Sequence, residues 1–148
     1  MTMRIFYGTE SGNSEMVASD IADEYGLEAE DLTELDADVF EAGTLYLIVC
    51  ATHGEGELPE GVDEFADALR DSSPDLTGVR YAMFGLGDST YPDYSKGSEV
   101  LDALLAELGA ERVGEYGRHD AAGGSDCSEV GLSWAEMVVE QHALVPVG

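Results

Sequence analysis

Apolar and polar positions follow two different periods along the chain. Nearly continuous apolar runs, typical of buried strands, cover residues 3–7, 45–51 and 80–86, and weaker runs cover 27–32 and 112–116. Between them, apolar residues recur every three or four positions, which predicts helices over 13–25, 61–71, 94–108 and 132–142. Strands that alternate with helices predict an α/β fold with a parallel sheet covered on both faces.

Three of the loops that follow predicted strands are rich in glycine and small polar residues. They cover residues 8–14, 52–59 and 85–94. In open α/β sheets, ligands bind outside the carboxyl ends of the strands, near a topological switch point. Because these loops would meet at one edge of the sheet, they predict a single binding site there.

The first loop offers hydroxyl and amide groups but no Lys or Arg. Its candidate residues are Thr9, Glu10, Ser11, Gly12, Asn13 and Ser14. The dipole and free N–H groups of the following helix can hold an anion such as a terminal phosphate. An ordinary helix cap needs only one such residue, and the loop is neither a Walker A motif nor a GxGxxG fingerprint.

The other two loops are suited to a flat ligand. Gly54 and Gly56 would let the backbone pass close to it, Tyr91 is a natural stacking platform, and Asp88 could accept hydrogen bonds from ring N–H groups. Each loop also has a simpler interpretation, either as a strand-to-helix connection with an exposed His53 or as a surface turn whose tyrosines pack locally.

The charge balance is extreme, with 32 Asp and Glu against 6 Lys and Arg and a formal net charge of -26. This charge predicts that the protein does not bind nucleic acid, because phosphate backbones require a cationic surface. The acidity could steer an electron carrier toward basic partners. We favour the alternative, a surface adapted to a salt-saturated cytoplasm, because the acids occur on every predicted helix and Lys96 is the single lysine.

Length and composition predict one domain over residues 1–148. The chain has no long apolar run for a membrane helix and no basic-then-apolar leader, so we expect a soluble, cytoplasmic monomer. Two cysteines are too few for a disulfide framework, and Cys50 is expected to be a buried thiol. The spacing of cysteines and histidines predicts no metal site.

Taken together, the three loops resemble those of the flavodoxin family. Residues 9–14 (TESGNS) resemble its T-x-[ST]-G-N-[ST] phosphate loop. ATHGEGELPEG at 51–61 and FGLGDSTYPDYSKGSEVLDALLAELGAERV at 84–113 resemble the FMN domains of diflavin reductases and the related short-chain flavodoxins. The fifth predicted strand carries no long insertion, which agrees with the short-chain type.

This resemblance implies a three-layer sandwich with a five-stranded parallel sheet of order 2-1-3-4-5 and one FMN. The first loop would hold the phosphate, Tyr91 would stack on the outer face of the flavin, and Asp120 would match a family acid near it. The residues carried over to the two sides of the ring are Ala51, Thr52, His53 and Gly54 on the inner side, and Leu86, Gly87, Asp88, Tyr91, Asp93, Tyr94 and Ser95 on the other.

The resemblance further implies a one-electron carrier that shuttles between a reductase donor and an acceptor protein, rather than an enzyme acting on a small substrate. It would cycle mainly between flavin semiquinone and hydroquinone. In the family a loop peptide turns its carbonyl toward the flavin N5–H. The matching peptide here is Gly54–Glu55, and glycine makes that turn inexpensive. A ring site without Lys or Arg would keep the potential of the reduced flavin low.

Two other function classes fit the same fold class. A flavodoxin-like domain that binds no flavin could be a protein-interaction module, and a colourless purified protein would favour it. A receiver domain of the same sheet order would need an Asp where Ala51 stands and a Lys after the fifth strand, so it is rejected.

His53 stands where diflavin reductases often have an aromatic residue. Protonation of this imidazole near the ring would make the reduction potential depend on pH around the histidine's own titration. We expect His53→Phe to remove that dependence. Potentiometric titrations of both proteins from about pH 5 to about pH 8, the range in which histidine changes its charge, would check this. A curve of potential against pH that is the same in both proteins would refute the role.

Overall fold

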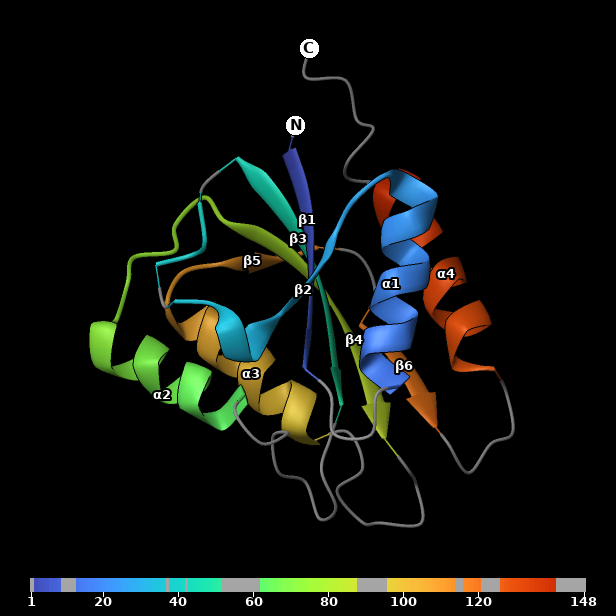
Figure 1. The fold of residues 1–148 in the computed structure, drawn as a ribbon. Helices are drawn as coiled ribbons and strands as arrows, with labels where there is room; N and C mark the ends of the chain where they lie inside the picture. Colours follow the sequence, from blue (N-terminus) through green and yellow to red (C-terminus); the bar gives the residue numbers. More distant parts are fainter. Residues whose placement is uncertain are drawn as a thin grey trace.

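All the strands of the sheet described in the computed structural model are parallel. The structure describes residues 2–8, 13–36, 38–41, 43–51, 62–87, 96–113, 116–120 and 126–140. The strands are β1 (Thr2–Gly8), β2 (Ala29–Asp31), β3 (Thr44–Ala51), β4 (Arg80–Gly87), β5 (Glu111–Arg112) and β6 (Gly117–Asp120). Their order is β2-β1-β3-β4-β5, and β6 also pairs with β4, so that β5 and β6 share the fifth position (Figure 1). The predicted order 2-1-3-4-5 is confirmed.

Two pairs of helices cover the two faces of this sheet. The helices are α1 (Asn13–Tyr25), α2 (Val62–Ser72), α3 (Lys96–Glu107) and α4 (Cys127–Val138), and a 3-10 turn, η1 (Leu32–Glu34), follows β2. Helices α1 and α4 pack on one face and α2 and α3 on the other, as Figure 1 shows. No helix in the described part of the chain is long and apolar enough to cross a membrane.

The core is divided by the sheet into two apolar clusters. Along β3, Leu45, Leu47 and Val49 face α1 and α4, whereas Tyr46 and Ile48 face α2 and α3. All five side chains are fully buried, as the apolar run predicts for a strand covered on both sides. Burying each such side chain contributes about 1.5–3 kcal/mol, so this strand organises both layers.

The fifth strand departs from the prediction. A single strand was expected over 112–116, but pairing with β4 stops after Arg112 and resumes at Gly117. The second piece fits because it begins with glycine. A Cβ at Gly117 would lie 2.7 Å from Phe84 Cδ1 and 2.7 Å from Trp134 Cδ1, within the stacked Phe84–Trp134 pair. A strand without a continuous apolar run gives little signal of where its pairing stops and resumes.

The last helix begins five residues before the predicted start at 132. Its first turn is polar, so the apolar period does not reveal it. The Asp126 side chain caps the helix by accepting hydrogen bonds from the backbone N–H groups of Ser128 (2.9 Å) and Glu129 (3.3 Å). The Asp126–Glu129 spacing is therefore a usable start signal that periodicity alone overlooks.

The other boundaries lie within a few residues of the prediction. Helix α1 coincides with the predicted 13–25, whereas β2 is shorter than the predicted 27–32. The expected starts of two helices, at 61 and 94, lie outside the described residues.

Gly131 sets how closely α4 approaches α1. A Cβ at this position would lie 2.5 Å from Val17 Cγ1 and 3.3 Å from Phe84 Cε2. Gly131→Ala should therefore destabilise the fold by roughly 1–3 kcal/mol through overpacking, despite the better helix propensity of alanine. Urea unfolding would measure the loss. Ser133→Ala, at an exposed position of the same helix, is the control, and equal stability of the two variants would contradict the packing argument.

Candidate functional site

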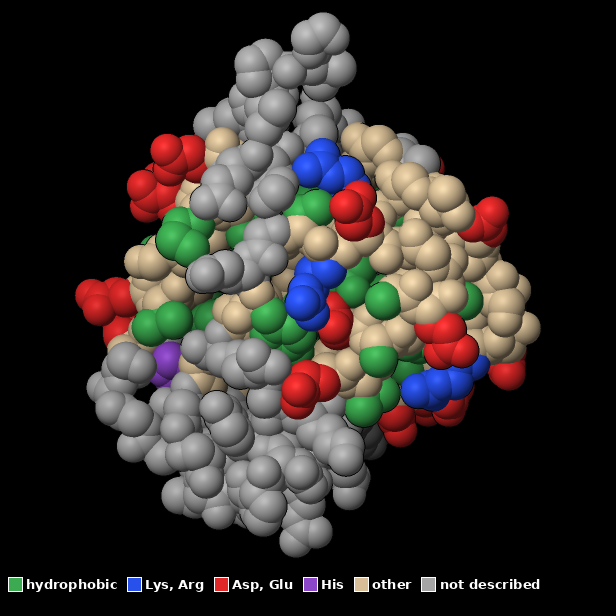
Figure 2. Space-filling view, turned by 180° about the vertical axis from the view of Figure 1, so that it is seen from behind, with side chains coloured by type: hydrophobic (Ala, Val, Ile, Leu, Met, Phe, Trp, Pro, Cys, Tyr) green, Lys and Arg blue, Asp and Glu red, His purple; other side chains and the backbone are tan. Residues whose placement is uncertain are grey.

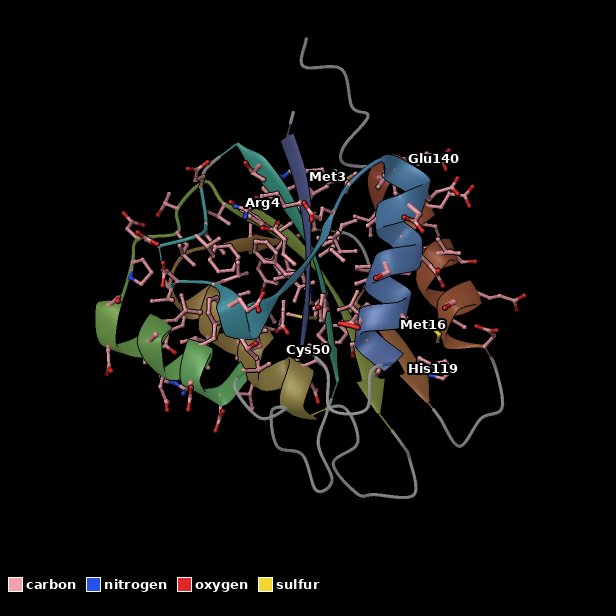
Figure 3. The ribbon with its side chains drawn as sticks, in the orientation of Figure 1. Met3, Arg4, Met16, Cys50, His119 and Glu140 are labelled. Carbon is pink, nitrogen blue, oxygen red and sulfur yellow. The ribbon has the colours of Figure 1, made fainter. Side chains whose placement is uncertain are left out.

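The strand ends that carry the predicted loops lie at one edge of the sheet. The strand register pairs Gly8 with Cys50, Ala51 with Leu86, and Gly87 with Asp120. Helix α1 begins at the same edge. Figure 3 shows Met16 of its first turn and His119 of β6 at this end, with Met3, Arg4 and Glu140 toward the other. The strand ends from which the three predicted loops continue thus share one edge of the sheet.

Six of the predicted site residues fall in described elements. Asn13 and Ser14 start α1, Ala51 ends β3, Leu86 and Gly87 end β4, and Asp120 ends β6. The other candidates lie outside the described residues and stay predictions. They are Thr9, Glu10, Ser11, Gly12, Thr52, His53, Gly54, Asp88, Tyr91, Asp93, Tyr94 and Ser95.

Ser14 is the predicted site residue with the clearest chemical signal. It lies in the first turn of α1 and is fully buried. Its Oγ has no hydrogen-bond partner among the described residues. Leaving a buried hydroxyl unsatisfied costs about 1–3 kcal/mol, so such a group calls for an explanation. A phosphate oxygen at the helix N-terminus would accept a hydrogen bond from this hydroxyl, and the helix dipole would favour the anion. Ser14 therefore fits the phosphate end of the implied cofactor.

The first turn of α1 is tied to β1 through a contact that the sequence pattern does not reveal. The Tyr7 hydroxyl donates a hydrogen bond to Glu15 Oε2 at 2.9 Å. Burial, the hydrogen bond to Glu15 and the nearby carboxylates of Asp31, Glu15 and Glu34 together raise the pKa of Tyr7 to about 12. The phenol is therefore a protonated donor throughout the neutral range.

Cys50 and His119 also lie near this edge. Cys50 is fully buried, as expected, and burial raises the pKa of its thiol to about 12, so it carries no thiolate for nucleophilic chemistry or metal binding. His119 is buried on β6 opposite Leu86, a position that scattered single histidines in a sequence do not signal. Among the described residues, no group of three His, Cys, Asp or Glu side chains could hold a metal ion.

The charges around the site are acidic. The loop segments 8–14, 52–59 and 85–94 contain no Lys or Arg. In the described part of the chain, ion pairs join Arg4 to Glu30, Arg70 to Asp67, and Arg112 to Asp102. On the face shown in Figure 2, acidic side chains are spread around the surface rather than gathered in one patch. The loop segments themselves therefore offer an anion at the α1 N-terminus dipoles rather than cations.

Comparison with known proteins agrees with this architecture. The sequence model of the family described as "Flavodoxin" matches residues 5–134. The chain belongs to the flavodoxin family. The fold is similar to that of oxidised flavodoxin 1 from Bacillus cereus, with a TM-score of 0.81, 29% identity and coverage of 95% of this chain and 98% of that one. It is also similar to a short-chain flavodoxin associated with a PDU bacterial microcompartment, with a TM-score of 0.74, 27% identity and coverage of 95% and 99%.

Curated relatives in this family include much longer reductases. The chain is 33% identical over 142 residues to NADPH–cytochrome P450 reductase from Sus scrofa. The aligned segment covers 89% of this chain and 21% of the reductase. The Salmo trutta reductase is 35% identical over 143 residues, with 89% and 23% covered. The chain thus spans about a fifth of the length of these relatives. The predicted resemblance to reductases and short-chain flavodoxins is confirmed, whereas a halophilic origin stays a prediction.

The unsatisfied hydroxyl of Ser14 can be tested without any ligand. Ser14→Ala should stabilise the protein by about 0.5–2 kcal/mol, because it removes the cost of an unpaired buried hydroxyl and improves helix propensity. Ser19→Ala, exposed on the same helix, measures the propensity effect alone. Urea unfolding of the flavin-free proteins would compare them. A loss of stability in Ser14→Ala would mean that its hydroxyl is satisfied.

Proposed function

We propose that this protein is a single-domain, FMN-binding, one-electron carrier that exchanges electrons with redox proteins. The observation that carries the proposal is the buried Ser14 Oγ at the N-terminus of α1, which has no hydrogen-bond partner in the described part of the chain. It lies at the carboxyl edge of a flavodoxin-family sheet, where ligands of open α/β folds bind.

The phosphate would be held by short-range donors. Ser14 Oγ and the first backbone N–H groups of α1 would donate to it, together with the hydroxyls of Thr9 and Ser11. A phosphomonoester carries about -1.5 to -2 charge, and hydrogen bonds to such a charged group are about twice as strong as neutral ones. This arrangement can hold the anion without a lysine or arginine.

The ring would lie across the ends of β3 and β4. Thr52, His53 and Gly54 follow β3, whereas Leu86, Gly87 and Tyr91 end or follow β4, and the two strands are neighbours in the sheet. Tyr91 would stack on the ring and exclude water from one side. When bound, FMN supplies the one-electron chemistry that none of the protein side chains provides.

The electrostatics favour a carrier of low reduction potential. Adding an electron increases the negative charge of a chain whose formal net charge is already -26. Surface carboxylates close to the site disfavour that change, by an amount that decreases with distance and with salt. The proposed partners are a reductase that donates electrons and an acceptor protein, and the proposed state is a cytoplasmic monomer.

The first experiment is reconstitution of the flavin-free protein with FMN. We expect a yellow complex with one FMN per chain, and a spectroscopic redox titration that resolves two separate one-electron steps. Ser14→Ala should raise the Kd for FMN about 10- to 150-fold, which corresponds to losing one hydrogen bond to a charged group. It should leave the Kd for riboflavin, which lacks the phosphate, nearly unchanged.

Two results would contradict the proposal. A protein that takes up no FMN would instead favour a flavin-free interaction module. A complex that is reduced in a single two-electron step at every pH would retain the cofactor but exclude a one-electron carrier. Ser19→Ala is the matched control for the effect of Ser14→Ala on FMN binding.

A further inference from the structure

The hydrogen bond between Tyr7 and Glu15 joins the two sides of the first loop. Tyr7 precedes the last residue of β1, and Glu15 is the third residue of α1. Residues 8–14 separate the two along the chain, and the Tyr7 hydroxyl lies 2.9 Å from Glu15 Oε2. This contact therefore fixes the first turn of α1 relative to the end of β1, independently of what the intervening residues do.

The Tyr7 hydroxyl lies among carboxylates. The Tyr7 side chain is only 8% exposed, and the charges that act on it come from Glu15 on α1, Asp31 on β2 and Glu34 on η1. Tyr7 and Asp31 are direct partners in the register of β1 and β2. In this acidic corner the phenol is a donor that satisfies one carboxylate oxygen, and Glu15 is the carboxylate it binds.

Glu15 directly follows Ser14 in the first turn of the helix. A tether at Glu15 therefore limits rotation and displacement of the same turn that carries the buried Ser14 Oγ and the first free N–H groups. Donors fixed before an anion arrives bind it more tightly than donors that must first be ordered. A change of one hydrogen bond in this turn should thus affect binding of the phosphate more than binding of the ring.

We propose that Tyr7 is a positioning residue for the phosphate end of the site, acting through its hydrogen bond to Glu15. This inference rests on the proposed function, because the anion is taken to be the FMN phosphate. The role is distinct from that of Ser14, which would contact the anion itself. It assigns to Tyr7 an indirect share in the preference for FMN over riboflavin, which Ser14 and the helix N–H groups would provide directly.

The chain offers a matched control for this contact. Tyr81, near the start of β4, donates through its hydroxyl to Asp102 Oδ1 at 2.7 Å. This second tyrosine–carboxylate hydrogen bond joins β4 to α3 on the other face of the sheet. Tyr81 lies near the start of β4, whereas Gly87, at the site edge, ends it. Tyr81→Phe therefore removes a similar bond away from the site.

The experiment measures Kd for FMN and for riboflavin in the flavin-free forms of the wild type, Tyr7→Phe and Tyr81→Phe. We expect Tyr7→Phe to raise the Kd for FMN about three- to tenfold, a loss comparable to that of one ordinary hydrogen bond, because Tyr7 acts on the anion only indirectly. The Kd for riboflavin should differ by less than about twofold between Tyr7→Phe and the wild type. Tyr81→Phe should leave the ratio of the two constants at its wild-type value.

Two substitutions at Glu15 separate the hydrogen bond from the charge. Glu15→Gln removes the negative charge but keeps a side-chain oxygen that can accept from Tyr7, so FMN should bind at least as tightly as in the wild type. Glu15→Ala removes the charge and the acceptor, so FMN should bind more weakly than in Glu15→Gln. This pair also tests the inference if Tyr7→Phe does not fold.

The outcomes distinguish this inference from the proposed function. A wild-type protein that binds no FMN would refute the proposed function. A wild type that prefers FMN over riboflavin, with the same preference in Tyr7→Phe or with equal FMN affinity in Glu15→Gln and Glu15→Ala, would overturn the positioning role alone. Parallel weakening of FMN and riboflavin binding in Tyr7→Phe would likewise overturn it, because the contact would then be a general structural one.

Discussion

Burial of β3 on both faces is the constraint on which the rest of the structure depends. Leu45, Leu47 and Val49 on one side and Tyr46 and Ile48 on the other have no exposed surface. A strand without an exposed face needs helices above and below it, and parallel neighbours joined by crossover connections provide them. Each such connection returns the chain to the same starting edge, so the loops that follow the strands gather at the opposite edge. The position of the candidate site is thus a consequence of how the core is closed.

The same constraint explains why the first turn of α1 can carry chemistry. A helix that crosses back over a parallel sheet begins at the carboxyl edge, with its free N–H groups and the positive end of its dipole there. The packing of Val17 and Ile21 into the core holds the body of the helix, whereas the contact of Tyr7 with Glu15 holds its first turn. Ser14, on the buried side of that turn, has no partner within the described structure. The core thus determines where the helix lies, and one polar contact determines how its first turn is held.

Much of this could be predicted from the sequence, and the parts that could not share a physical reason. β3, β4 and α1 are long and strongly patterned, and their apolar residues reveal the element and its buried face. The fifth strand is short and polar at both ends, and its resumption at Gly117 depends on space beside Phe84 and Trp134, which are distant in sequence. The first turn of α4 is polar and is held by Asp126. The phosphate loop was predicted from residue types, but the bond between Tyr7 and Glu15 and the burial of Ser14 depend on how the helix is placed, which no local pattern contains.

The high negative charge and the lack of a cation in the loop segments are compatible because the two electrostatic effects act over different distances. Donor groups bind a phosphate oxygen at about 2.9 Å, where no salt ion can intervene. Repulsion from surface carboxylates acts over longer distances and is screened beyond about 10 Å at 0.1 M salt and about 3 Å at 1 M. As ionic strength rises, the diffuse repulsion of a -26 chain therefore weakens while the local donors keep their strength. The phosphate site proposed at Ser14 and the helix N–H groups would consequently be opposed less by the acidic surface in a salt-rich medium than in a dilute one. The proposed dipolar recognition of a phosphate is therefore compatible with the acidic surface of this chain.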